Sequence, residues 1–157
     1  TTTYVGTTEE YDGNSWTSSN SLNTVRAEMG SCGTQTAGLA FGGSTPITGA
    51  TEEYDGNSWT SSPGSLNTAR YGLSGAGIQT AAVAFGGYIT AGTAATEEYN
   101  GTTWTSSPAS LATARYYLAG AGTQLAALAF GGNPGTAPTA ATEEWTKALV
   151  TTELGAS

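Results

Sequence analysis

Four pairs of adjacent glutamates are the residues of this sequence with the clearest chemical potential. Each pair lies in a Thr-Glu-Glu-aromatic segment, and these segments begin at Thr8, Thr51, Thr96 and Thr142. Paired carboxylates can act as general acid and base, or they can bind a hard cation such as calcium. However, neighbouring residues of a strand point to opposite faces of the sheet, so the two carboxylates of one pair cannot converge on one site. A structural role is therefore the favoured prediction, and a cation site is the alternative.

Arginines recur in step with the glutamates and are their expected partners. Three of the four basic residues in the chain occupy one position in successive repeats. A charge buried between sheets needs a partner of opposite charge, so we expect one glutamate of each pair to face inward and meet a buried arginine. The candidate ion-pair residues are Glu9, Glu10, Arg26, Glu52, Glu53, Arg70, Glu97, Glu98 and Arg115.

The composition lacks or is poor in the side chains that most often take part in catalysis. The sequence has no histidine, which is the commonest general base and metal ligand. Its single cysteine, Cys32, cannot form an intrachain disulfide and is expected to be a small buried residue. The net charge of −8 argues against nucleic acid or an anionic membrane as partner, and no run of 18 apolar residues predicts a transmembrane helix. We therefore expect no enzyme activity, no metal and no cofactor.

The aromatic residues fall into two groups. Trp16, Trp59 and Trp104 recur at one position of the repeat, so we expect them to pack between sheets rather than to form a platform for sugars. Four tyrosines do not recur and lie in or beside segments of variable length. These candidate ligand-binding residues are Tyr71, Tyr88, Tyr116 and Tyr117.

A repeat with steps of 43, 45 and 46 residues positions all these groups. Asp-Gly or Asn-Gly after the tyrosine predicts a tight hairpin with a type I′ turn, which needs positive φ at both central residues. For the best-defined unit, this predicts outer strands c and d at residues 52–54 and 58–60. The inner strand b is expected at residues 80–85, the innermost strand a at 70–74, and the a–b turn at 75–79.

The pattern resembles the kelch repeat of β-propellers. The matching residues are Gly-Gly after an apolar strand, the following Tyr, the Trp, and the Arg after a short loop. The resemblance implies an all-β fold of four-stranded antiparallel blades, with one propeller or propeller segment over residues 1–157. Its repeats would begin near 8, 51 and 96, with a degenerate one near 142. The segment Thr-Glu-Glu-Tyr-Asp-Gly-Asn-Ser-Trp-Thr also resembles tandem repeats in large structural proteins of marine bacterial viruses.

The chain is expected to supply about three to three and a half blades, whereas closed propellers need about 4–8. The blade count therefore predicts either truncation from a longer chain or assembly with other copies. The first residue is Thr1 rather than Met, so we expect a processed chain or a piece of a longer one. Length varies only in the b–c and d–a connections, which the alternation of turns places on one face. These loops are residues 44–50, 61–69, 88–95, 106–114 and 133–141.

Together these features favour a non-catalytic structural or binding module that uses the variable loops of one face for recognition. The viral resemblance implies a virion or extracellular location, such as a fibre or tail. The expected partners are other copies of the chain or further blades, and a cell-surface glycan or protein. The alternative is a lectin-like propeller that binds carbohydrate through its loop tyrosines.

Overall fold

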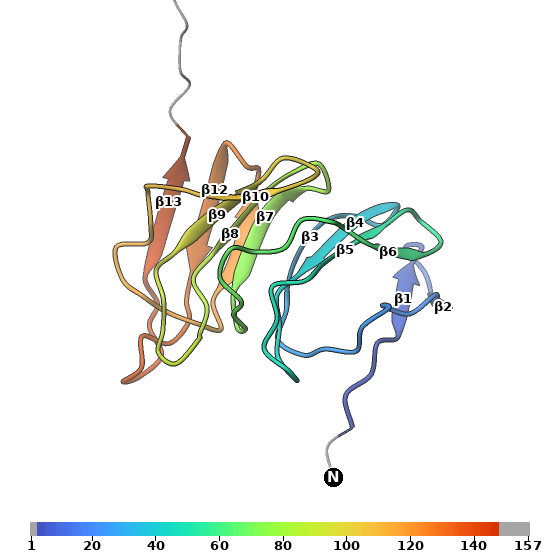
Figure 1. Cartoon of the computed structure of the whole chain (residues 1–157), viewed down its shortest axis with the longest axis horizontal. Helices are drawn as coiled ribbons and strands as arrows, with labels where there is room; N and C mark the ends of the chain where they lie inside the picture. Colours follow the sequence, from blue (N-terminus) through green and yellow to red (C-terminus); the bar gives the residue numbers. More distant parts are fainter. Residues whose placement is uncertain (1–2, 148–157) are drawn as a thin grey trace, which may run out of the picture.

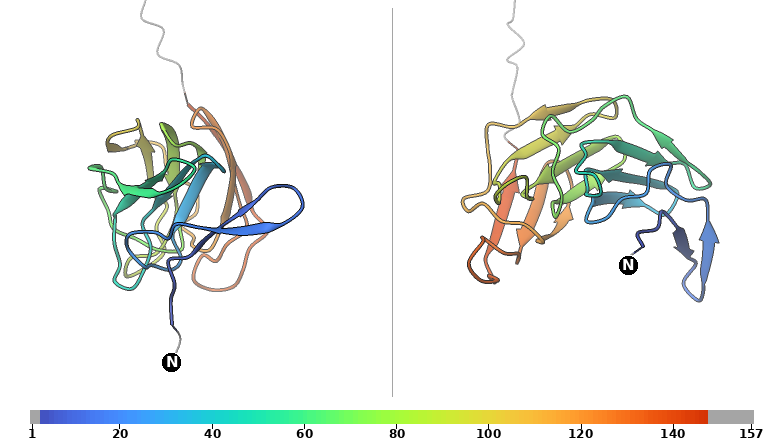
Figure 2. Two further views of the ribbon diagram at one scale, coloured as in Figure 1. Left: turned by 90° about the vertical axis from the view of Figure 1, so that its right-hand side faces the viewer. Right: turned by 60° about the horizontal axis from the view of Figure 1, so that its bottom comes forward.

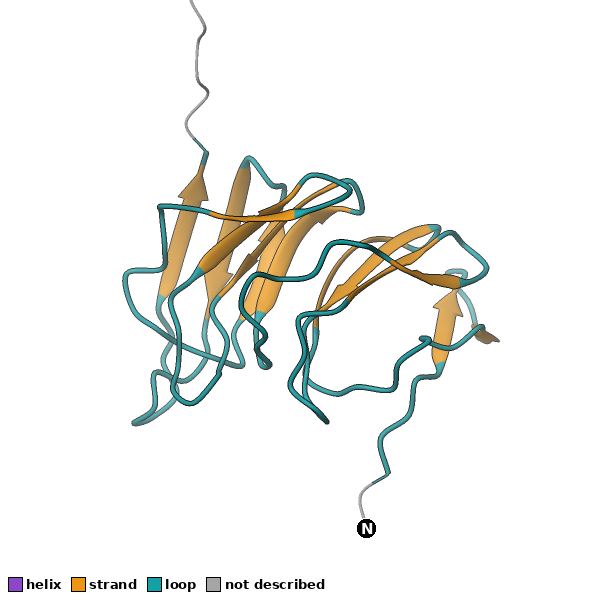
Figure 3. Ribbon diagram, viewed as in Figure 1, coloured by secondary structure: helices purple, strands orange, loops and turns teal. Residues whose placement is uncertain are grey.

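The computed structural model describes residues 3–147, and every regular element in that range is a β-strand. Thirteen strands form four antiparallel sheets that follow one another along an arc (Figures 1 and 3). Across the described residues there is no helix that could span a membrane.

Each sheet is built from consecutive strands. The first contains β1 (Thr8–Tyr11) and β2 (Trp16–Ser19). The second contains β3 (Gly30–Thr34), β4 (Ala37–Phe41), β5 (Thr51–Tyr54) and β6 (Trp59–Ser61). The third contains β7 (Ser74–Ile78), β8 (Ala81–Phe85), β9 (Thr96–Tyr99) and β10 (Trp104–Ser106). The fourth contains β11 (Ala119–Gly122), β12 (Ala126–Phe130) and β13 (Thr142–Thr146).

The second and third sheets are complete four-stranded blades in the order a–b–c–d, which confirms the expected fold class. The first sheet corresponds to strands c and d, and the fourth to strands a, b and c. The strand d expected near the end of the fourth repeat falls at residues outside the described range. Figure 2 shows the first and fourth sheets at opposite ends of the arc, so the described sheets do not close into a ring.

The innermost strand lies four residues later than the sequence suggests. Residues 70–74 were expected to form it and residues 75–79 to turn, but β7 spans Ser74–Ile78 and the turn follows at residues 79–80. Glycines suggested a turn because they weaken an isolated strand. Here they make room for a neighbouring sheet: a Cβ at Gly75 would lie 2.5 Å from Cζ of Phe41. The strands expected at 52–54, 58–60 and 80–85 agree with β5, β6 and β8 to within one residue.

The c–d hairpins are tight, but their turn type differs from the expected one. Tyr11 pairs with Trp16, and the two central residues between Asp12 and Ser15 are Gly13 and Asn14. Only the glycine has positive φ, at 98°, so the turn is not type I′. The Asp12 carboxylate instead accepts the amides of Asn14 and Ser15, both at 2.8 Å. These bonds lower the pKa of Asp12.

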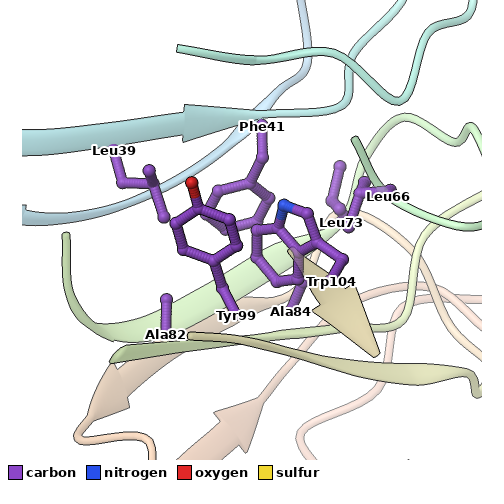
Figure 4. Close-up of a cluster of buried hydrophobic side chains, with 8 residues drawn as sticks. All are labelled: Leu39, Phe41, Leu66, Leu73, Ala82, Ala84, Tyr99 and Trp104. Atoms are coloured by element: carbon purple, nitrogen blue, oxygen red, sulfur yellow. The ribbon is translucent and has the colours of Figure 1, made fainter. Parts of the chain in front are cut away.

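The hydrophobic core lies between sheets rather than within any one of them. Leu39 and Phe41 of β4 face Ala82 and Ala84 of β8, and Trp104 covers the ring of Phe41 at a centroid distance of 4.9 Å (Figure 4). The next junction repeats this arrangement one sheet later. Its buried residues are Ala76, Val83, Phe85, Leu118, Ala127 and Ala129. Each sheet therefore completes the core of its neighbour.

Two side-chain hydrogen bonds occur both between the first and second sheets and between the second and third sheets. Trp104 Nε1 donates to Thr51 Oγ1 at 2.9 Å, and Trp59 Nε1 donates to Thr8 Oγ1 at the same distance. The hydroxyl of Tyr99 donates to Glu53 at 2.6 Å. In the preceding sheet, the hydroxyl of Tyr54 donates to Glu10. The Thr-Glu-Glu-aromatic segment thus connects each sheet to both neighbours.

Trp104 and Trp16 occupy the same repeat position but differ in burial, which allows a matched test. Trp104 is 5% exposed and Trp16 is 67% exposed. Trp104→Ala should lower the free energy of unfolding by about 3–5 kcal/mol, because it empties the junction core. Trp16→Ala should change it by less than about 0.5 kcal/mol. Urea denaturation followed by far-UV circular dichroism measures both, and equal losses would contradict the assignment of the core to the junctions.

Candidate functional site

The variable loops gather at one end of the sheets, which we call the loop face. It comprises the b–c connections 44–50, 88–95 and 133–141 together with the d–a connections 61–69 and 106–114. Its inner part is formed by residues 27–28, 71–72 and 116–117, where Ala27, Tyr71 and Tyr116 pair with residues at the start of the b–c connections. Figure 1 shows the b–c connections at the lower end of the strands and the a–b turns at the upper end. Hydrogen bonds between backbone groups join the d–a connections to the b–c connections. Leu66 N donates to Gly49 O at 2.9 Å, and Leu111 N donates to Ala94 O at 3.0 Å. The expected geometry of one shared face is confirmed.

A buried arginine–glutamate pair anchors the loops to each sheet. Arg26 Nη2 lies 2.7 Å from Oε1 of Glu52, and both side chains are at most 2% exposed. The same guanidinium donates through Nη1 to Ala50 O, at the end of a b–c loop. The carboxylate accepts the Asn23 and Thr24 amides, at the end of the preceding d–a connection. One ion pair therefore holds the ends of both loop types.

The pair recurs in the next two sheets with one variation. Arg70 pairs with Glu97, and Arg115 pairs with Glu143 at 2.7 Å. Glu97 also accepts both the backbone and the side-chain amide of Asn67. At Glu143 the corresponding donor is Ala112, which offers only its backbone N–H. The Glu143 side chain is 23% exposed, compared with 2% for Glu97.

In the first three sheets, the second glutamate of the pair faces the following sheet instead of an arginine. Glu10 and Glu53 accept tyrosine hydroxyls, and Glu98 pairs with Lys147. The fourth sheet has Trp145 where the earlier sheets have tyrosine, and that side chain carries no hydroxyl for Glu98. Glu9 is exposed on the first sheet, whose described strands include no strand a to carry an arginine. Of the expected ion-pair residues, the structure thus joins Glu52 and Glu97 to arginines, but not Glu9, Glu10, Glu53 or Glu98.

A strained backbone position marks the inner part of the loop face. Glu28, Gly72 and Tyr117 occupy one repeat position and have φ values of 57°, 61° and 54°. Positive φ is uncommon for residues other than glycine and often marks a functional position. Successive repeats are connected here, because Gly72 N donates to Glu28 O and Tyr117 N donates to Gly72 O. The side chains of Glu28 and Tyr117 are therefore carried on a fixed backbone.

The four candidate ligand-binding tyrosines come together at this position in a closed ring of contacts, and two of them, Tyr71 and Tyr116, share one repeat position directly after the arginine. Tyr71 lies 5.4 Å from Tyr88, which lies 5.0 Å from Tyr116 between ring centroids. Tyr117 completes the ring, 5.1 Å from Tyr116 and 6.5 Å from Tyr71. The first of these repeats has Ala27 and Ser44 where the next has Tyr71 and Tyr88. We call these four residues the tyrosine cluster.

Glu28 extends the tyrosine cluster and was not identified from the sequence. Its carboxylate accepts the hydroxyl of Tyr117 at 2.7 Å, across 89 residues of chain. The absence of a side chain at Gly72 allows this contact, since a Cβ there would lie 3.0 Å from the Tyr117 ring. The bond to Glu28 raises the pKa of Tyr117 to about 12, and burial raises the pKa of Tyr71. The Tyr117 hydroxyl therefore keeps its proton at neutral pH and donates it to Glu28.

The chemistry available on the loop face is that of aromatic contact and hydrogen bonding. Tyrosine offers a large, rigid, amphipathic surface at low conformational cost. Tyr117 is 54% exposed, while the other three rings are partly buried and support it. Within residues 3–147, no group of three His, Cys, Asp or Glu side chains is placed to hold a metal ion.

Cys32 is partly buried and packs against the core between the second and third sheets. Burial raises its pKa to about 12. The thiolate, which is the reactive form of cysteine, is therefore scarce near neutral pH. This environment suits a packing residue rather than a nucleophile.

No protein-family model matches the chain, and no curated protein matches it. The geometry of the loop face is therefore the basis for any assignment of function.

The difference between the buried ion pairs generates one prediction. Arg70→Ala should lower the free energy of unfolding by about 3–5 kcal/mol, because it leaves the Glu97 carboxylate buried without its charge partner. Arg115→Ala should cost less, because water reaches part of Glu143. Chemical denaturation of the two variants gives the comparison. A larger loss in Arg115→Ala would contradict it, whereas recovery of stability in Arg70→Met with Glu97→Met would support it.

The environment of Cys32 generates another prediction. At pH 8 the folded protein should react with a disulfide reagent more than about tenfold more slowly than the urea-unfolded chain, whose thiol has an ordinary pKa near 8.5. The rate of release of the chromophore measures this. Equal rates in the folded and unfolded chains would show that Cys32 is accessible as a thiolate.

Proposed function

We propose that this chain is a non-catalytic, surface-displayed binding module, in which a fixed array of propeller blades presents variable loops for recognition. The supporting observation is the division between scaffold and loops. The hairpins and a–b turns keep one length, whereas all length variation falls in loops that share one face. The buried ion pairs hold the ends of these loops while the residues between them differ from repeat to repeat. Such loops on a rigid scaffold are common sites of binding.

The kelch-like spacing of Gly-Gly, Tyr, Trp and Arg supports a propeller-type module. The repeat sequence resembles tandem repeats in structural proteins of marine bacterial viruses. This resemblance supports a place on a virion, as part of a fibre or tail, or at a cell surface. In that setting the loop face would contact a glycan or a protein of the host surface. The acidic net charge of −8 suits such a partner better than nucleic acid.

A lectin-like function is the second candidate, and the tyrosine cluster favours it. Sugar rings present apolar C–H faces that stack on aromatic rings, while their hydroxyls need hydrogen-bond partners. The exposed ring of Tyr117 supplies the first kind of contact, and the Glu28 carboxylate and the tyrosine hydroxyls supply the second. Both candidates place the partner on the loop face, and they differ in whether the partner is carbohydrate.

A glycan array probed with the labelled chain tests the two candidates. Binding to a defined class of glycan, reduced at least about tenfold by Tyr117→Ala or Tyr88→Ala, would support the lectin function. Tyr4→Ala is the matched control, because Tyr4 is 46% exposed and lies outside the tyrosine cluster. Tyr117→Phe then separates the contribution of the ring from that of the hydroxyl.

The same array can contradict the assignment of the loop face. Binding that survives both tyrosine substitutions but is lost on changing Asp55 and Asn57 would place the partner on the c–d hairpins at the opposite end. An absence of glycan binding would exclude the lectin function for the glycans tested. The protein-binding form of the proposal would then be examined by labelling the loop tyrosines in the presence of host surface extract.

A further inference from the structure

Within residues 3–147, the two ends of the sheet array expose the two complementary halves of one junction. The outer side of the first sheet, which we call the upstream face, exposes Tyr11 at 49% and Trp16 at 67%. The outer side of the fourth sheet, which we call the downstream face, exposes Leu128 and Phe130 at 40% each. Figure 2 shows these sheets at opposite ends of the arc. Large apolar side chains gathered on an exposed sheet face indicate an interaction surface.

The junctions inside the chain show what fits each face. Leu39 and Phe41 occupy the repeat positions of Leu128 and Phe130, and they are fully buried by the following sheet. The residues that cover them include Tyr99 and Trp104, which occupy the positions of Tyr11 and Trp16. The downstream face therefore has the shape that packs against an upstream face. The junction between the second and third sheets already shows this contact within the chain.

The polar groups of the two faces also match. In the internal junction, Trp104 donates to Thr51 and Tyr99 donates to Glu53. The corresponding acceptors on the downstream face are Thr142 and Glu144, both of which are exposed. The corresponding donors on the upstream face are the indole N–H of Trp16 and the hydroxyl of Tyr11. The donors and acceptors of these two hydrogen bonds therefore have counterparts on the open faces.

We infer that two copies of this chain associate end to end, with the downstream face of one copy against the upstream face of the other. Trp16 of one copy would cover Phe130 of the other and donate to Thr142, and Tyr11 would donate to Glu144. Such a contact is heterologous, so it either closes into a ring or continues into a chain. This inference concerns the ends of the array and does not depend on the proposed role of the loop face.

The contact between copies should be weaker than an internal junction. The described part of the first sheet has only the two outer strands, so no inner-strand alanines cover Leu128 and Phe130. A small interface of this kind gives a concentration-dependent equilibrium. If two copies close into a ring, both junctions form at once and reinforce each other.

Sedimentation equilibrium over a range of concentrations tests the inference. The unmodified chain should show a mass that rises from one chain toward two or more. Trp16→Ala and Phe130→Ser should each remain at the mass of one chain, because each has lost one of the two faces. Their equimolar mixture should form a species of two chains only, since the intact downstream face of the first fits the intact upstream face of the second.

Controls separate this association from misfolding and from the loop face. Far-UV circular dichroism verifies that each variant folds, and Leu128→Ser replaces Phe130→Ser if the latter does not. Tyr117→Ala, an exposed aromatic change on the loop face, should leave the association unchanged. An unmodified chain that stays at the mass of one chain at every concentration would overturn the inference. Self-association of Trp16→Ala alone would also overturn it, because that variant lacks an upstream face.

Discussion

The structure depends on one constraint: the inner strands are apolar on both faces, so both faces must be covered. In β8, Ala82 and Ala84 point to the preceding sheet, while Val83 and Phe85 point to the following one. No repeat can bury itself, and stability comes from contacts between nearest neighbours. The small side chains on one face are the counterpart of the large ones on the other. The same rule explains why Leu128 and Phe130 are exposed on the last described sheet, whereas Leu39 and Phe41 are fully buried at the same positions of the second sheet.

The charged groups have a different role from the apolar ones. Each buried arginine–glutamate pair lies at the loop end of a sheet and holds the points where the b–c and d–a connections enter it. A buried ion pair is weak support for stability in itself, but losing one partner is costly, so the ends of the loops are fixed. The residues between those ends can then change without disturbing the sheets. This is why Tyr71 and Tyr88 can stand where the preceding repeat has alanine and serine.

Features that recur in the sequence could be predicted, and features created by contact between repeats could not. Equal spacing was enough to predict the blades, the buried arginines and the grouping of the variable loops on one face. The innermost strand was misplaced because Gly75 looks like a turn residue until the ring of Phe41 is seen against it. Glu28 was missed because its partner, Tyr117, lies 89 residues away and only the stacking of three repeats brings the two together. The sequence predicted that one glutamate of each pair meets an arginine, but the partner of the other one could not be predicted, since nothing local reveals a tyrosine hydroxyl from the next sheet.

The junction between the third and fourth sheets shows which parts of the repeat can be replaced. Trp145 stands in the place of a tyrosine and has no hydroxyl for Glu98, but Lys147 supplies a different partner for the same carboxylate. The indole N–H of Trp145 donates to the backbone carbonyl of Gln124 at 2.9 Å. The shape of the contact is kept nevertheless: Phe85 still packs where Gly120 leaves room, since a Cβ there would lie 2.5 Å from its ring. Polar groups need some partner, and several can serve, whereas a close-packed ring leaves no space for a different backbone. Shape is therefore the stricter requirement in this array, and it is shape that the two open end faces share with the closed junctions.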